Sequence, residues 1–120
     1  MKTVMIIDDM PINLNVIADM ILDKYKIMVA TSGKKALNLI SKRKPDLILL
    51  DFNMPEMNGS EVAKTLSEDP ENADIPVVFI SGSVASEVIE SCDHSNIKGA
   101  LEKPVERKEL LAILDELLQP

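Results

Sequence analysis

The chain lacks several residue patterns on which large classes of proteins depend. Its single cysteine, Cys92, excludes an internal disulfide and a cysteine-based zinc cluster, so we interpret it as an incidental or buried thiol. The only histidine, His94, lies in a polar run without metal-ligand spacing and is expected to be a plain loop residue. A glycine-rich phosphate loop is also absent, which argues against a nucleotide site.

Positive charge and long apolar runs are scarce as well. The chain has 13 lysines and arginines and 20 aspartates and glutamates, which gives a net charge of −7. Because nonspecific binding of nucleic acid needs a basic surface, we expect no direct nucleic-acid partner. The apolar run at residues 4–7 is too short for a signal peptide, and no stretch approaches the length of a membrane span. These absences predict a cytoplasmic protein with no membrane partner.

Short apolar runs alternate with amphipathic segments along the chain, whose 120 residues suit one domain over residues 1–120. Strands are expected at residues 4–7, 27–30, 47–50, 77–80 and, more weakly, 97–102. Helices are expected at residues 11–23, 33–43, 60–67, 84–89 and 106–118. Five strand-helix units with short connections favour right-handed crossovers and a parallel sheet covered by helices on both faces.

Polar side chains follow the carboxyl ends of four of these strands: Asp8 and Asp9, Asp51, Ser81 and Lys103. Ligands of such sheets bind beyond those ends, so these side chains are expected to converge. Taken singly, each has a plainer interpretation: helix capping for the acidic pair, a turn for Asp51 or Ser81, and a solvated side chain for the lysine. Their shared position at one edge of the sheet favours the joint interpretation as a site.

The residue types at this edge suit phosphoryl chemistry. Three converging carboxylates repel one another and raise their own pKa values unless a cation is present. Oxygen ligands in this number suit Mg²⁺, which keeps several waters and is commonly shared with a phosphate. Lysine can pair with phosphoryl oxygens, and a serine hydroxyl can donate a hydrogen bond to one of them. Held beside such cations, the Asp51 carboxylate can attack phosphorus and form an aspartyl phosphate.

Four segments together resemble a response-regulator receiver domain of two-component signalling, over the whole chain. They are Ile6-Ile7-Asp8-Asp9, Leu49-Leu50-Asp51 followed by MPEMNG at residues 54–59, Ser81, and Lys103-Pro104. The resemblance implies an α/β fold: a single-domain, doubly wound (βα)5 three-layer sandwich of the flavodoxin-like kind, with a five-stranded parallel sheet in the order 2-1-3-4-5. It also implies a phosphoprotein that assists its own phosphorylation and dephosphorylation and is not a classical enzyme.

The resemblance assigns a metal site to the acidic residues. Asp8 and Asp9 would hold Mg²⁺, or Mn²⁺ in its place, directly or through water. Asp51 would be both a ligand and the phosphoacceptor, and the backbone carbonyl of Asn53 would complete the protein ligands. A histidine kinase or a phosphotransfer protein would supply the phosphoryl group, with small phosphodonors as substitutes.

The remaining family positions concern the response to phosphate. Ser81 would be the switch hydroxyl, and Lys103 would pair with the phosphate beside a bond to Pro104 that is commonly cis. Asn53 and Ser83 occupy positions that tune hydrolysis of the acyl phosphate. The face formed by residues 84–89, 97–102 and 106–118 would control an output domain or a partner protein. The formation of a homodimer on phosphorylation is a further possibility that the sequence does not decide.

Two positions depart from the family pattern. Ala100 stands where a switch tyrosine or phenylalanine is usual, so an aromatic rotamer switch is excluded there. Gly82 replaces a commoner alanine and is expected to loosen the Ser81 loop. Two alternatives are therefore kept: a pseudo-receiver that binds partners without phosphorylation, and a haloacid-dehalogenase-type phosphatase. The second class needs another aspartate where this chain has Asn53.

Overall fold

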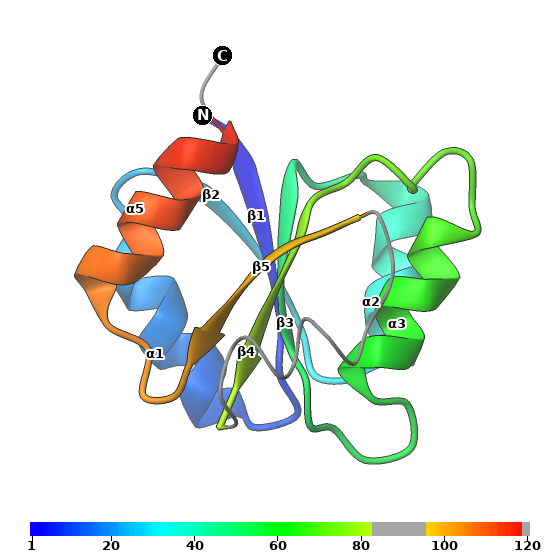
Figure 1. Cartoon of the computed structure of the whole chain (residues 1–120), viewed down its shortest axis with the longest axis horizontal. Helices are drawn as coiled ribbons and strands as arrows, with labels where there is room; N and C mark the ends of the chain where they lie inside the picture. Colours follow the sequence, from blue (N-terminus) through cyan, green and yellow to red (C-terminus); the bar gives the residue numbers. More distant parts are fainter. Residues whose placement is uncertain (83–95, 119–120) are drawn as a thin grey trace.

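A computed structural model describes residues 1–82 and 96–118 of the chain. Within these residues a five-stranded sheet carries helices on both faces (Figure 1). The strands are β1 (Thr3–Ile7), β2 (Lys26–Ala30), β3 (Leu47–Asp51), β4 (Val77–Ser81) and β5 (Ile97–Glu102). The helices are α1 (Pro11–Ile21), α2 (Gly33–Lys42), α3 (Gly59–Ser67) and α5 (Arg107–Leu118). The helix expected at residues 84–89 lies outside the described residues.

The sheet order is β2-β1-β3-β4-β5, and every neighbouring pair is parallel. This confirms the flavodoxin-like order that the family resemblance implied. The chain runs from β1 outward to β2 and then returns to the other side of β1 for β3. In open α/β sheets a ligand crevice forms where the order reverses in this way. Asp8 and Asp51 lie at that point, at the carboxyl ends of β1 and β3.

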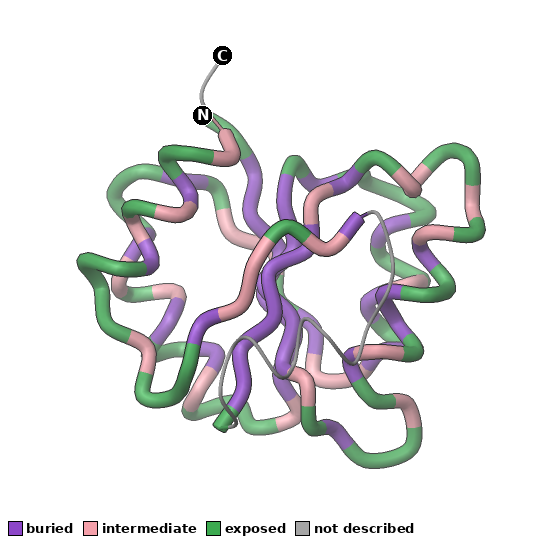
Figure 2. Tube along the Cα trace, in the orientation of Figure 1, coloured by how far each residue is buried: buried purple, intermediate pink, exposed green. Residues whose placement is uncertain are grey.

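Apolar cores cover both faces of the sheet, with α1 and α5 on one side and α2 and α3 on the other (Figure 1). Every residue of the central strands β1, β3 and β4 is buried, whereas the edge strands β2 and β5 are partly exposed (Figure 2). Strands buried on both faces read as continuous apolar runs in the sequence, which is why the central three were predicted with little ambiguity.

Polar caps fix where two of the helices begin. The Ser32 hydroxyl accepts a hydrogen bond from the Lys35 backbone nitrogen at 3.1 Å and caps the start of α2. α3 begins with a reciprocal capping box between Asn58 and Glu61, at 2.9 and 3.2 Å. That box was not anticipated, although an Asn followed three residues later by Glu is its sequence signature. It anchors the end of the loop that leaves Asp51.

The described helices are short, and α5 is the longest at 12 residues. Within residues 1–82 and 96–118, none combines the length and the apolarity needed to cross a bilayer.

Candidate functional site

Three carboxylates meet at the carboxyl edge of the sheet. Asp51 is the last residue of β3, and Asp8 and Asp9 follow β1. One oxygen from each of the three lies within 4.8 Å of the others. Asp8 and Asp51 are only 1% and 3% exposed, and Asp9 is half-buried. Burying negative charges this closely is unfavourable unless a cation compensates them.

Helix capping does not account for the acidic pair. The N-cap of α1 is Met10, which makes no side-chain cap, and Pro11 supplies the first helical position. The Asp8 Oδ1 atom accepts a hydrogen bond from the Met10 backbone nitrogen at 2.9 Å. This bond orients the Asp8 carboxylate at the sheet edge, outside the helix.

Asp51 receives partial compensation from two donors. The Lys103 Nζ atom lies 3.1 Å from Asp51 Oδ1, and the Asn53 backbone nitrogen donates to the same oxygen at 3.3 Å. Burial nevertheless raises the pKa of Asp51 above its usual value, and the charge of Asp8 raises it further, against the lowering effect of Lys103 and Asn53. The protein's own groups therefore supply less positive charge than this carboxylate needs.

The donor set fits a hard divalent cation. All three converging side chains offer carboxylate oxygens, which Mg²⁺ prefers over nitrogen or sulfur. The charge deficit at Asp51 is also the kind that a bound cation would correct. Asp8, Asp9 and Asp51 are thus placed to hold Mg²⁺, while the backbone carbonyl of Asn53 remains a prediction as the fourth protein ligand.

Ser81 and Lys103 approach the same edge from β4 and β5. Ser81 is fully buried at the end of β4, and its backbone oxygen accepts a hydrogen bond from the Lys103 nitrogen at 2.7 Å. The residue before Ser81 pairs in register with Asp51. The Lys103–Pro104 peptide bond is cis, as the family resemblance implied. All five side chains predicted at the strand ends therefore lie at one edge of the sheet.

Gly59, the first residue of α3, packs against the backbone that carries Asp51. Its nitrogen donates to the Phe52 oxygen at 3.0 Å. A Cβ atom on Gly59 would lie 2.7 Å from the Asp51 carbonyl oxygen and 2.8 Å from the Phe52 Cα. Both contacts are closer than real Cβ atoms show, so only glycine fits. The sequence placed Gly59 in the family segment at residues 54–59 but did not indicate this packing, because the close approach of two segments leaves no local signal.

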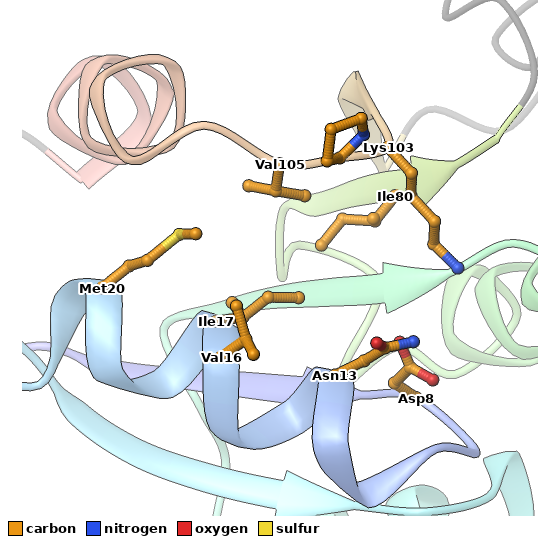
Figure 3. Close-up of a pocket in the computed structure, with 9 residues that line it drawn as sticks. Asp8, Asn13, Val16, Ile17, Met20, Ile80, Lys103 and Val105 are labelled. Carbon is orange, nitrogen blue, oxygen red and sulfur yellow. The ribbon is translucent and has the colours of Figure 1, made fainter.

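A largely apolar cleft of about 400 Å³ extends from the acidic edge along α1. Figure 3 shows Asp8, Asn13 and Lys103 at one end and Met20 at the other. The full lining comprises Asp8, Asn13, Val16, Ile17, Met20, Ile80, Lys103, Pro104 and Val105. Sequence reasoning did not find this cleft, since it lies between α1 and the segment joining β5 to α5.

Ala100 lies in β5 directly beside Phe79 of β4, its partner in the strand register. It is half-buried and packs against the core on the α2 and α3 side. Phe79 in turn makes an edge-to-face contact with Phe52, with ring centroids 5.2 Å apart. An aromatic ring is thus present next to the usual switch position, on the neighbouring strand.

The strand order and the buried acidic edge place the chain among the flavodoxin-like α/β proteins. A family model described as the response regulator receiver domain matches residues 4–115. The chain therefore belongs to the response regulator receiver domains of two-component signalling, which are signalling domains and not classical enzymes.

Named relatives agree with this assignment. The polar-differentiation response regulator DivK of Brucella ovis is 33% identical over 105 residues, covering 87% of this chain and 85% of the relative. A probable cyclic di-GMP phosphodiesterase of Vibrio cholerae is 40% identical over 80 residues, which is 67% of this chain and 18% of that protein's length. The structure of the Vibrio cholerae chemotaxis response regulator CheY4 superposes with a TM-score of 0.89 at 25% identity, covering 98% of both chains.

Proposed function

We propose that this receiver accepts a phosphoryl group on Asp51 from a phosphohistidine donor, in a reaction that depends on Mg²⁺. The observation that supports it most is the environment of Asp51. Its carboxylate is buried within 4.8 Å of the Asp8 and Asp9 oxygens, and the Lys103 ammonium lies 3.1 Å away. A nucleophile flanked by a cation and a cation site is what phosphoryl transfer requires.

Each residue of the site has its own role in the transfer. A carboxylate oxygen of Asp51 forms the new bond to phosphorus, while the bond between phosphorus and the donor's imidazole nitrogen breaks and its electron pair stays on that nitrogen. Mg²⁺, when bound, supplies charge neutralisation for the phosphoryl oxygens. Lys103 exchanges its contact with Asp51 for a phosphoryl oxygen, and the Ser81 hydroxyl donates a hydrogen bond to another. Attack by water on phosphorus, assisted by the same residues, breaks the bond to the Asp51 oxygen, releases inorganic phosphate and returns Asp51 to its carboxylate form.

Phosphate would act by shifting the population of two conformations. The phosphoryl group adds negative charge and acceptor oxygens, which favours the conformer in which Ser81 and Lys103 close on it. The hydrogen bond from the Lys103 nitrogen to the Ser81 oxygen joins the ends of β4 and β5, so a movement of either residue would displace both strands. The proposed output face comprises β5, α5 and residues 84–89, of which the last lie outside the described residues. It would address an output domain or a partner protein in the cytoplasm, or a second phosphorylated copy.

The cleft beside α1 suits the phosphodonor protein. It begins at Asp8 and Lys103 and continues over apolar side chains, among them Ile17 and Val105 (Figure 3). On the same helix, Ile12 and Val16 are 71% and 50% exposed, and Val16 lines the cleft, so α1 presents large apolar side chains to solvent at this surface. A helix that brings a phosphohistidine to Asp51 would cover this surface, which supports a histidine kinase or a phosphotransfer protein as the donor.

Incubation with Mg²⁺ and acetyl phosphate is expected to add the mass of one phosphoryl group to the intact protein. Chelation of Mg²⁺ is expected to prevent the addition, because the acidic edge then lacks its compensating charge. The Asp51→Ala variant should stay unmodified. Intact-mass spectrometry checks all three results. An adduct that survives the Asp51→Ala change, or no adduct at all, would remove Asp51 as the phosphoacceptor.

The Val16→Asp variant is expected to separate protein donors from small ones. A carboxylate on this exposed position should slow transfer from a phosphorylated histidine phosphotransfer protein by about tenfold or more, since an interface hot spot is commonly worth 2 kcal/mol. Labelling by acetyl phosphate should be unchanged, because the variant leaves in place Asp8, Asp9, Asn53 and Lys103, whose groups lie around Asp51. Equal slowing with both donors would mean that the variant damages the site, and no slowing would place the donor elsewhere.

Ala100 keeps the pseudo-receiver alternative open, since the family's aromatic switch is absent at that position. Backbone NMR spectra of β5 and α5, recorded with and without Mg²⁺ and beryllofluoride, distinguish the two functions. A phosphorylation switch predicts shifts that reach α5, whereas an inert interaction module predicts shifts confined to the acidic edge. The structure gives the phosphatase alternative no support. That class needs a second aspartate two residues after Asp51, and the Asn53 side chain at this position is an amide that cannot act as a carboxylate.

A further inference from the structure

One edge of the sheet is open on the side away from β5. Among the described residues β2 pairs only with β1 (Figure 1). In a parallel pair, each residue directs its N–H and C=O groups to the same side, and successive residues alternate. The Lys26 nitrogen donates to the Lys2 oxygen, and the Ala30 oxygen accepts from the Asp8 nitrogen. Lys26, Met28 and Ala30 therefore face β1, and Ile27 and Val29 direct their backbone groups outward.

An apolar hollow of about 470 Å³ lies beside the first half of this edge. It is lined by Thr3, Leu22, Tyr25, Lys26, Ile27, Met28 and Arg43. Leu22 is 60% exposed and Val29 is 47% exposed, so apolar side chains continue from the hollow along the strand. The edge thus offers both unpaired strand geometry and apolar surface for an added segment.

Positive charge gathers around the same end of the sheet, although the chain as a whole is acidic. Six of the 13 lysines and arginines lie there, all exposed: Lys2, Lys24, Lys26, Lys42, Arg43 and Lys44. Nearby acidic groups have partners of their own: Asp23 lies 3.7 Å from Arg107, and Asp115 accepts a hydrogen bond from the Tyr25 hydroxyl at 3.3 Å. Asp46 accepts from the Thr3 nitrogen at 2.7 Å, and Asp74 pairs with Lys44 at 3.0 Å.

Two of these cations border the hollow directly. Lys26 and Arg43 both line it, and neither forms an ion pair with any residue that the structure describes. Their positive charges are therefore available to a partner that enters the hollow.

We propose that the open edge of β2 binds an extended acidic and apolar segment of a partner protein, which adds to the sheet as a sixth strand. Backbone groups of Ile27 and Val29 would pair with the segment, its apolar side chains would enter the hollow, and its carboxylates would meet Lys26 and Arg43. A second copy of this chain is the less suitable occupant, since its own β2 strand carries Lys26 and no carboxylate. Lysines on edge strands commonly prevent such self-pairing, and the same charges select an acidic strand.

A fluorescent peptide of four Glu-Val repeats tests this directly on the unmodified protein. We expect saturable binding, and amide hydrogen exchange at Ile27 and Val29 should slow when the peptide is bound. The same peptide with every backbone nitrogen methylated cannot pair as a strand through either edge and should not bind. Binding of the methylated peptide with equal affinity would show a purely electrostatic contact and would overturn the proposal.

The double variant Lys26→Glu and Arg43→Glu is expected to weaken peptide binding by about tenfold or more, because two attractive pairs become repulsive. The double variant Lys34→Glu and Lys64→Glu makes the same change in net charge on exposed positions of α2 and α3, and should bind as the unmodified protein does. Equal weakening in both, or no peptide binding to the unmodified protein, would overturn the proposal. So would preferential binding of phosphatidylglycerol vesicles or single-stranded DNA to the same edge.

Discussion

Replacing Gly59 by alanine is expected to lower the free energy of unfolding by about 1–3 kcal/mol, the usual cost of an added methyl group in a closely packed position. The new Cβ would lie 2.7 Å from the Asp51 carbonyl oxygen and 2.8 Å from the Phe52 Cα, and both neighbours are backbone atoms that cannot rotate away. The backbone that carries Asp51 must then shift. We therefore expect slower phosphoryl uptake from acetyl phosphate as well. Urea titration and the labelling rate measure the two effects.

Gly82→Ala is the matched control, because it makes the same change at the same edge of the sheet. A Cβ atom there meets no described atom within 4 Å, and Gly82 does not have a positive φ. Alanine should raise the free energy of unfolding by about 0.4–1 kcal/mol, by reducing the freedom of the unfolded chain. If Gly59→Ala were as well tolerated as Gly82→Ala, the packing of α3 against the Asp51 strand would not be the constraint inferred here.

The contrast between these two glycines shows what the sequence could and could not predict. Strand and helix positions follow from periodicity within one segment, so the buried runs of β1, β3 and β4 were predicted to within one residue of their ends. Gly59 belongs to the matched family segment and Gly82 departs from the family pattern, but the sequence around either glycine does not show whether a methyl group would fit there. Only the packing of α3 on the Phe52 backbone distinguishes them, and that distance depends on how two segments meet.

The candidate site was easier to predict than its surroundings. Parallel strands bring their carboxyl ends to one edge, so topology alone places Asp8, Asp51 and Lys103 together. The sequence does not predict the distances between these residues. The contact of 3.1 Å between Lys103 and Asp51 depends on the path that β5 takes beside β4. The cleft along α1 was missed for the same reason, because its walls come from segments far apart in the chain.

Replacing Asp51 by asparagine is expected to raise the free energy of unfolding at neutral pH without divalent cations, because the raised pKa of Asp51 means that its ionised form is less favourable in the folded protein than in the unfolded chain. Asparagine keeps the shape of the side chain and removes one of the three crowded charges. The charge attraction with Lys103 is lost, but burial and the charge of Asp8 outweigh it, as the raised pKa of Asp51 indicates. Thermal or urea unfolding in the presence of a chelator measures the difference.

The pH dependence of this difference has a definite sign. The folded-state pKa of Asp51 lies above the value of 3.8 expected for the unfolded chain, so the folded state holds this proton more tightly. The unmodified protein should therefore lose stability relative to Asp51→Asn as the pH rises from 3.8 through the folded-state pKa. Asp8, Asp9 and Lys103 face Asp51, and they are unchanged in both proteins. A constant difference across this window would mean that charge at Asp51 is not its cause.

Mg²⁺ should reverse the order of stability. At 100 times its dissociation constant a cation that binds only the folded state adds about 2.7 kcal/mol, which the unmodified protein should gain and Asp51→Asn should largely lack. Lys103→Met should destabilise the metal-free protein but have little effect in the Asp51→Asn background, since the carboxylate that Lys103 compensates is then gone. Lys98→Met, on an exposed position of the same strand, is the control. Equal stabilisation of all variants by Mg²⁺ would place the cation away from Asp51, and the charge deficit would need another explanation.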